Sequence, residues 1–311
     1  MLDALSKAFF HGLARSRRVE ALASRVGMAR PTSFGRRFIA GETLGEAIAA
    51  ARAIQAAGMG VTLDQLGESV TTLAEADAAT RVYLQTIPAI VASGVERNIS
   101  LKLSQLGLDL DRAACLDNLR KILETSRPHA FFVRIDMEAS VTVPATLEVF
   151  ESAWTLGHRH LGLVLQSSLY RSEEDARRLS AQGVRIRLVK GAYKEPRAVA
   201  HQKKADVDAA YVRIMEGLLR GGTYPAIATH DPAIVDHAKR FTTGNRIAPD
   251  RFEFQMLYGI RRDLQGALVA DGYRLRLYVP FGKQWFPYFM RRLGERPANV
   301  AFVLRALIRD R

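Results

Sequence analysis

Short runs of β-branched and apolar residues alternate with longer segments of helical period from about residue 46 onward. Such alternation is typical of repeated βα units. The runs predicted to be strands are Met59–Leu66, Asn98–Leu103, Phe131–Met137, Leu161–Gln166, Val184–Val189, Pro225–Thr229, Arg251–Met256 and Arg274–Val279. Eight such units in roughly 250 residues match the usual size of a closed barrel. An open doubly wound sheet rarely needs eight strands. The pattern therefore predicts an α/β protein with a (βα)8 TIM barrel.

The first 45 residues show no strand pattern and are predicted to form a helical N-terminal arm, followed by the barrel domain over residues 46–311. Two basic helices, Leu2–Leu13 and Arg17–Gly27, are expected before the segment Pro31–Gly41. A solvated helix face or contact with an anionic surface explains the many arginines of the arm. These arginines are Arg15, Arg17, Arg18, Arg25, Arg30, Arg36 and Arg37.

Composition narrows the class of protein. With 48% hydrophobic and 25% charged residues, the chain of 311 residues is expected to be soluble and globular. Its net charge of +13 admits nucleic acid, an anionic membrane surface or acidic small molecules as partners. Neither a signal sequence nor a run of roughly 18 apolar residues is visible, so we expect a cytoplasmic protein that meets membranes only peripherally. Cys115, the single cysteine, excludes an internal disulfide and is expected to be a buried structural thiol.

Polar side chains end or follow every predicted strand. In chain order they are Glu68, Lys102, Asp136, Gln166, Arg187 with Lys190, Thr229 with His230, Gln255, and Tyr278. In a barrel of this kind, chemistry gathers at the carboxyl ends of the strands. Loop polarity explains any one of these residues, but it explains the complete set poorly. We therefore expect a site with several cations, anchored by Glu68 and Asp136.

Several familiar chemistries lack their residues. The seven histidines are scattered, and His158 and His160, which alternate, precede a strand and so lie at the wrong end for the expected site. No zinc-binding pattern is therefore predicted, and we expect no metal. The chain also lacks a Gly-x-Ser-x-Gly elbow, a Gly-x-Gly-x-x-Gly motif and a P-loop.

The last predicted helix, Trp285–Leu293, begins a second constellation of polar residues. Tyr288, Arg291, Arg292 and Glu295 follow helical spacing and share one stripe. Paired arginines suit bidentate capture of a carboxylate or phosphate. An ordinary salt-bridge stripe on an outer helix is the alternative, but the helix starts just after the eighth strand, at the mouth of the barrel. The residues alone thus predict a mouth that binds an anionic, partly apolar small molecule, and they leave the cofactor and the reaction class open.

The chain resembles the proline dehydrogenase family, including the catalytic domain of bifunctional proline utilisation proteins, from about residue 59 to 303. The most specific segments are RLVKGAYKEP at Arg187–Pro196, FEFQMLYG at Phe252–Gly259, YVPFGKQWFPYFMRRLGERPAN at Tyr278–Asn299 and DQLGE at Asp64–Glu68. The resemblance implies a distorted (βα)8 barrel that binds FAD noncovalently. It implies oxidation of L-proline to 1-pyrroline-5-carboxylate by hydride transfer to the flavin, the first step of proline catabolism to glutamate. A quinone is the implied electron acceptor.

The same resemblance implies roles for individual residues. The catalytic positions are Lys102, Asp136, Tyr278, Arg291 and Arg292. The substrate-binding positions are Lys102, Leu188, Tyr278, Tyr288, Arg291, Arg292, Glu295 and Glu68. In the family pattern, the arginine pair and Lys102 hold the proline carboxylate, while Glu68 and Arg291 form a gate. The cofactor positions are Asp136, Gln166, Arg187, Lys190, Gly191, Ala192, Tyr193, Lys204, Thr229, His230 and Gln255.

Three positions depart from the family pattern, and several alternatives stay open. Lys194 stands where some members have tryptophan, Asp231 where some have asparagine and Phe281 where tyrosine is frequent. A 4-hydroxyproline dehydrogenase is disfavoured by the bulk of Tyr278. A folate reductase barrel is disfavoured by the paired arginines. A nucleic-acid-binding module remains as an explanation for the net charge, without an exposed basic stripe bearing aromatics to support it. Contact between the basic arm and an anionic membrane is expected.

Overall fold

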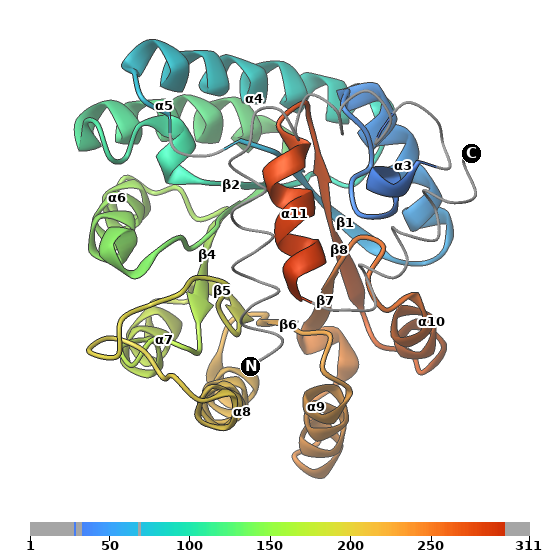
Figure 1. The fold of residues 1–311 in the computed structure, drawn as a ribbon. Helices are drawn as coiled ribbons and strands as arrows, with labels where there is room; N and C mark the ends of the chain where they lie inside the picture. Colours follow the sequence, from blue (N-terminus) through green and yellow to red (C-terminus); the bar gives the residue numbers. More distant parts are fainter. Residues whose placement is uncertain (1–27, 29–32, 68–69, 296–311) are drawn as a thin grey trace.

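A computed structural model of the chain describes residues 28, 33–67 and 70–295, without the side chains of Phe34 and residues 291–295. Figure 1 shows helices arranged around a central barrel of strands. The strands are β1 (Gly60–Gln65), β2 (Asn98–Leu101), β3 (Phe132–Ile135), β4 (Leu161–Gln166), β5 (Arg185–Val189), β6 (Ala226–Ala228), β7 (Glu253–Leu257) and β8 (Leu275–Phe281). All neighbouring pairs are parallel, and β1 pairs with β8 to close the barrel. The predicted (βα)8 fold and its eight strands are confirmed.

Among the described residues, one helix precedes the barrel and one follows each strand, and all except the last cover the outside of the barrel. They are α3 (Leu44–Ala56), α4 (Leu73–Ser93), α5 (Arg112–Ser126), α6 (Val143–Thr155), α7 (Ser172–Ala181), α8 (Lys204–Gly221), α9 (Pro232–Gly244), α10 (Arg262–Ala270) and α11 (Trp285–Glu295). Short 3-10 turns occupy Phe34–Arg37, Leu103–Leu106, Arg127–His129, Ser140–Thr142 and Pro249–Arg251. None of the helices in the described ranges is long and apolar enough to cross a membrane.

The main hydrophobic core lies between the barrel and its helices. Alternate strand residues, such as Ile99 and Leu101 of β2, are buried with helix residues such as Ile122 of α5. Because successive side chains of a strand point to opposite faces, the intervening residues face the barrel interior. Cys115 is fully buried in this core, as predicted, and burial raises the pKa of its thiol to about 12.

A second, smaller core holds α11 over the carboxyl ends of the strands. Phe38 and Ile39 pack there with Trp285 and Phe289 of α11, and with Leu66, which follows β1. In Figure 1, α11 lies in front of the barrel and not in the outer ring of helices. The helix was expected to begin at the barrel mouth, and this packing confirms its position.

The segment before α3 is fastened to the end of β8. The amide of Ala40 donates to the carbonyl of Pro280 at 2.9 Å, and the amide of Gly282 donates to the carbonyl of Gly41 at 2.9 Å. The N-terminus of α3 is closed by a capping box between Thr43 and Glu46. That helix therefore begins at Leu44, slightly before the predicted domain boundary.

Both predicted helices of the arm, Leu2–Leu13 and Arg17–Gly27, lie outside the described residues. Within the described part of the arm, Arg36 donates to Glu46 at 2.5 Å and to the carbonyl of Met28 at 3.0 Å. This arginine is therefore engaged within the protein and does not form a solvated helix face. The division into arm and barrel stays a prediction.

Candidate active site

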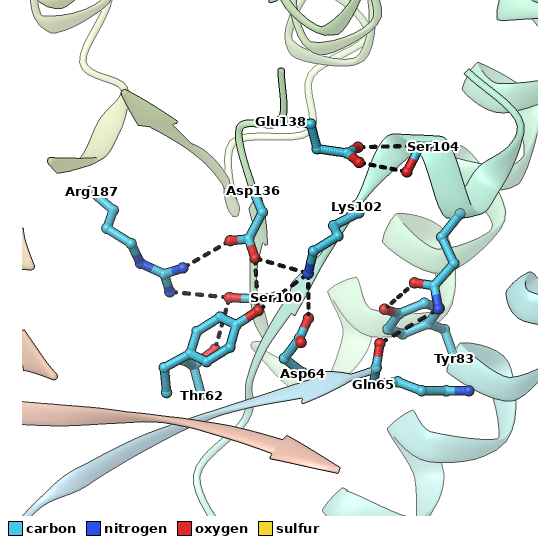
Figure 2. Close-up of polar contacts among 12 residues, drawn as sticks. Thr62, Asp64, Gln65, Tyr83, Ser100, Lys102, Ser104, Asp136, Glu138 and Arg187 are labelled. Carbon is cyan, nitrogen blue, oxygen red and sulfur yellow. Dashed lines mark hydrogen bonds and ion pairs between the residues drawn. The ribbon is translucent and has the colours of Figure 1, made fainter. Parts of the chain in front are cut away.

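Polar residues on the inner face of the barrel meet near the carboxyl ends of the strands (Figure 2). Asp64 belongs to β1, Lys102 follows β2 directly, Asp136 follows β3 directly and Arg187 lies within β5. These strands are not all adjacent, so only closure of the barrel brings the four side chains together. Two carboxylates and two cations thus share one partly enclosed space.

Lys102 stands between the two carboxylates. Its Nζ lies 3.5 Å from Asp64 Oδ1, 3.4 Å from Asp136 Oδ2 and 3.3 Å from the hydroxyl of Tyr278. The Lys102 side chain is 14% exposed, whereas that of Asp64 is only 1% exposed. The ammonium group therefore keeps a side toward the mouth, while Asp64 lies beneath it.

Arg187 is held in a fixed orientation by three neighbours. Its Nη1 donates to Asp136 Oδ1 at 2.9 Å and its Nη2 to the hydroxyl of Ser100 at 3.0 Å, while its Nε donates to Gln255 Oε1 at 2.5 Å. The Ser100 hydroxyl also lies 3.2 Å from that of Thr62. Because the Arg187 side chain is only 5% exposed, these bonds replace solvent and fix the plane of the guanidinium.

The buried environment determines the protonation of this cluster. Burial raises the pKa of Asp64 to about 6, although the charge of Lys102 opposes the rise. For Lys102 the balance is reversed: burial alone would lower its pKa, but Asp64 and Asp136 outweigh burial and raise it. The lysine is consequently a permanent cation at the base of the mouth.

Tyr278 completes the group from β8. Its hydroxyl donates to Asp136 Oδ2 at 2.8 Å, and its ring lies under the guanidinium of Arg187 at 5.4 Å from the ring centre. Burial, and then the charge of Asp136, raise the pKa of Tyr278 well above its usual value, so the hydroxyl stays protonated. β8 extends to Phe281, so Tyr278 lies inside the strand. The sequence pattern had instead predicted that Tyr278 lies near the strand end.

A second layer of charges lies deeper in the barrel and supports Arg187. Gln255, which accepts from Arg187, also donates to Glu253 on the same strand. Glu253 in turn receives a bidentate pair of bonds from Arg276 of β8, at 2.9 and 3.0 Å. The orientation of Arg187 therefore depends on a chain of side chains that runs down the barrel interior.

A cluster of two lysines and two carboxylates lies beyond the end of β5. Lys190 Nζ lies 2.6 Å from Asp208 and 2.8 Å from Asp231, and Lys204 contacts the same two carboxylates. Lys204 is 75% exposed, whereas Lys190 is 26% exposed. A cavity of about 520 Å³ between α8 and α9 is lined by Lys204, Asp208 and Asp231, among others. Asp231, a departure from the family pattern, thus binds a predicted cofactor residue directly.

The turn after Lys190 is exposed and requires glycine at residue 191. Gly191 has a φ of +109°, and a Cβ at this position would lie 2.3 Å from the hydroxyl oxygen of Ser168. Ala192 and Tyr193 follow it and are exposed. An exposed glycine turn flanked by two lysines fits the phosphate-bearing part of a dinucleotide cofactor.

The other predicted cofactor residues lie at the same end of the barrel. The Nε2 atom of His230 accepts from the amide of Leu257 at 2.9 Å, and the hydroxyl of Thr229 accepts from the amide of Asp231 at 3.1 Å. Gln166 is buried and donates to the carbonyl of Glu138 at 2.8 Å. Their side chains thus anchor the loops around the mouth.

The structure does not test every predicted substrate residue. Glu68 lies outside the described residues, as do the side chains of Arg291, Arg292 and Glu295, although their helix α11 is described. Tyr288 of α11 is 7% exposed and belongs to the small core at the mouth. Leu188 is fully buried and follows the inward-facing Arg187, so its side chain faces the helices by strand alternation. Contact between Leu188 and a substrate stays a prediction.

Residue-level sequence analysis missed Asp64, Ser100 and Asp208. The first two carry a signal that period-two alternation reveals: Thr62 and Asp64 fall on one face of β1, and Ser100 and Lys102 on one face of the β2 segment. Asp208 lies in α8, where a charged residue is ordinary, so no pattern in the sequence distinguishes it. Among the described residues, no group of three or more His, Cys, Asp or Glu side chains is arranged to hold a metal ion.

A closed parallel barrel with its ionisable residues gathered at the carboxyl ends of the strands defines a (βα)8-barrel enzyme. The family model described as Proline dehydrogenase matches residues 47–305, and the chain belongs to this family. It is 41% identical over 280 residues to proline dehydrogenase 2 of Bacillus subtilis (strain 168), covering 88% of this chain and 92% of that protein. It is 40% identical over 313 residues to the proline dehydrogenase of Deinococcus radiodurans, covering 99% and 100% of the two chains.

A solved structure shares the fold. Proline utilization A (PutA) from Bdellovibrio bacteriovorus, inactivated by N-propargylglycine, superposes with a TM-score of 0.78 at 26% identity. The match covers 84% of this chain and 32% of that one, so the present chain spans about a third of the larger protein.

Proposed function

We propose that the enzyme oxidises L-proline to 1-pyrroline-5-carboxylate with FAD as the cofactor and a quinone as the electron acceptor. The observation that carries the proposal is the cluster of Lys102, Asp136, Arg187 and Tyr278 at the barrel mouth of a chain that is about 40% identical to proline dehydrogenases. FAD supplies an electron-accepting ring that takes a hydride from the proline carbon beside the nitrogen.

Lys102 is assigned to the substrate carboxylate. Its raised pKa keeps the ammonium charged, and its side chain is 14% exposed. Asp64 and Asp136 hold the ammonium from below. With Arg291 and Arg292 contributed by α11, the carboxylate would be held on several sides, and a fixed carboxylate orients the carbon that is oxidised.

Tyr278 and Tyr288 are assigned to the apolar ring of proline. Leu188, whose side chain faces the helices, is left out of this assignment. Tyr278 is anchored through its hydroxyl to Asp136, which fixes its ring. Glu295 is assigned to orienting the arginine pair, and Glu68 to a gate with Arg291. These assignments rest on the family pattern.

The cofactor is assigned to the side of the mouth formed by β4 to β7. Arg187, with three of its N–H groups fixed by protein acceptors, would offer its remaining donors and its charge to the isoalloxazine ring. Lys190 and Lys204 are assigned to the phosphates, next to the exposed residues Gly191 and Ala192. Asp136, Gln166, Tyr193, Thr229, His230 and Gln255 complete the predicted set.

Anaerobic titration of the purified protein with L-proline tests the function. Flavin absorption bands that bleach with L-proline, but not with 4-hydroxyproline or NADH, are the expected result. Flavin that stays oxidised in the presence of proline would overturn the substrate assignment. A protein that stays colourless after addition of FAD would overturn the cofactor assignment.

The acceptor and its location need a separate test. Two features suggest that the protein contacts a membrane: the many arginines before residue 40 and the quinone acceptor implied by the family. A chain lacking residues 1–27 should bind anionic liposomes less tightly than the full chain, with unchanged reduction of the flavin by proline. Equal liposome binding would remove the arm from membrane contact.

A further inference from the structure

A second polar pocket lies at the opposite end of the barrel from Lys102. It has a volume of about 430 Å³ and opens where β2, β3, β5 and β8 begin. Its polar lining includes Glu96, Arg97, Asn98, Arg185 and Arg276. This volume falls within the range of small-molecule sites. Nothing in the reaction proposed above uses this pocket.

Arg185 is the central residue of the pocket. The carbon of its guanidinium lies 4.2 Å from the ring centre of Phe132 and 4.5 Å from that of Tyr224. Both rings attract the cation without offering a lone pair to its N–H groups, so these ring contacts leave the N–H groups as donors. Its Nε is buried without a hydrogen-bond partner among the described residues, and none of the ion pairs in those residues includes Arg185.

The nearby carboxylates are already committed to another arginine. Glu253 receives Nε and Nη2 of Arg276, and Glu96 lies 2.7 Å from Nη1 of the same residue. Glu96 also accepts from the amide of Val61 at 2.8 Å. Neither carboxylate forms an ion pair with Arg185, although the charges of Glu253 and Glu96 act on it from a distance. Burial outweighs them and lowers the pKa of Arg185.

Other groups around the pocket add positive charge or unmet polarity. Arg134, only 1% exposed, donates to the backbone carbonyls of Leu163 and Arg185 and not to a carboxylate. Arg97 is exposed at the rim. Asn98 is 5% exposed, and its Oδ1 has no partner among the described residues. Rotation of this amide would present its NH₂ group to a ligand instead.

We propose that this pocket binds a small oxyanion, a phosphate or carboxylate group of a small metabolite, with the in-plane N–H groups of Arg185 as its principal donors. A planar guanidinium fork matches such an anion with two parallel hydrogen bonds. Arg97 at the rim adds charge. The proposal is independent of the proline reaction, because the pocket lies at the other end of the barrel.

Calorimetric titration with inorganic phosphate, and separately with acetate, tests the proposal. The full-length protein is saturated with FAD and proline so that anion sites at the catalytic mouth are filled. We expect saturable binding of at least one of the two anions to the unaltered protein, and binding about tenfold weaker or more for Arg185→Gln. The anion that binds more tightly identifies the chemistry of the ligand.

Arg112→Gln is the matched control, because it also removes one arginine charge, from a pair in which both side chains are more than half exposed. It should bind the anions as the unaltered protein does. Absence of saturable binding of both anions, or equal binding by R185Q and R112Q, would overturn the site. If R185Q does not fold, Arg97→Gln at the exposed rim replaces it, with weaker binding than R112Q expected and equal binding counting against the site. If FAD does not bind, the same comparison on the protein alone still tests the pocket.

Discussion

At the scale of single residues, the site depends on a buried carboxylate that the sequence hides inside a strand. Asp64 is surrounded by the apolar run of β1 and is fully buried, yet it faces Lys102 at 3.5 Å. Each group alone would be costly to bury. Together with Asp136, they form a compact group in which the two nearby carboxylates stabilise the charge of Lys102.

The unfolding free energy of the protein should depend on pH because of Asp64. Its pKa is about 6 in the folded protein, above its usual value of 3.8, so the folded state holds a proton that the unfolded state has released between about pH 4 and 6. The stability contributed by that proton is present at low pH and is lost as the pH rises through this window. Asp64→Asn cannot titrate. The unfolding free energy of the unaltered protein, minus that of D64N, should therefore fall by no more than roughly 3 kcal/mol between pH 4 and pH 7.

Urea unfolding of both proteins at several pH values measures this difference. Carboxyl groups away from Lys102 cancel in the subtraction, so the difference reports Asp64 together with the cluster around Lys102. A difference that does not change with pH would show that Asp64 titrates alike in the folded and unfolded chains.

Tyr278→Phe separates the hydroxyl of this residue from its ring. The ring, and its contact with Arg187, would stay, while the bonds to Asp136 and Lys102 would be lost. We expect kcat/KM for proline to fall about tenfold, with unchanged affinity for FAD measured by flavin fluorescence. Tyr170→Phe, which removes an exposed hydroxyl bound to the carbonyl of Arg197, serves as the control. A Y278F enzyme as fast as the Y170F control would remove the hydroxyl from the reaction.

At the scale of elements, the mouth is shaped by α11 and by the segment that precedes α3. Both pack over the strand ends, and both belong to the small core that includes Phe38, Trp285 and Tyr288. The segment approaches the turn after β7 so closely that only glycine fits: a Cβ on Gly259 would lie 1.7 Å from the carbonyl oxygen of Arg37. This contact ties the N-terminal segment to the barrel.

Gly259→Ala should break that contact. The residue also has a φ of +76°, which a side chain disfavours, so both the overlap and the backbone conformation oppose alanine. We expect a loss of at least about 2 kcal/mol in unfolding free energy. Gly266→Ala, in α10 with no heavy atom near its would-be Cβ, should instead stabilise the protein by up to about 1 kcal/mol. Similar melting temperatures for the two variants would contradict the packing described.

At the scale of the whole molecule, the barrel interior is a continuous polar column and not an apolar filling. It runs from Glu96 and Arg276 at one end, through Glu253 and Gln255, to Arg187 in the candidate active site. The apolar core lies outside the barrel, under the helices. Stability and site geometry are thereby linked, because the same side chains that span the interior also orient Arg187.

Glu253→Gln should therefore destabilise the whole barrel. It would leave the guanidinium of Arg276, 8% exposed, without its bidentate partner. Because Glu96 would still pair with Arg276, we expect a loss of about 2 kcal/mol, less than the roughly 3 kcal/mol or more for a buried charge left without any partner. Glu148→Gln, which breaks the exposed pair with Arg112, should cost no more than about 1 kcal/mol. Denaturant unfolding compares the two variants, and equal losses would show that the buried pair has no special weight.

The sequence determined much of this protein by itself. Alternation of short apolar runs with helical segments predicted the barrel and its eight strands, because hydrophobic period is a local property of the chain. Lys102, Asp136 and Arg187 were found because barrel chemistry gathers at strand ends. The family, too, is visible in short motifs such as that at Arg187–Pro196.

Only the tertiary structure decided which charges are partners. Asp64 meets Lys102, and Asp231 meets Lys190, across 38 and 41 residues of sequence. Such pairs arise when the closed barrel brings distant strands and loops together, and no local pattern records them. The structure likewise decided that Arg185 lies over two rings and that Glu253 pairs with Arg276 instead, because such contacts depend on several strands at once.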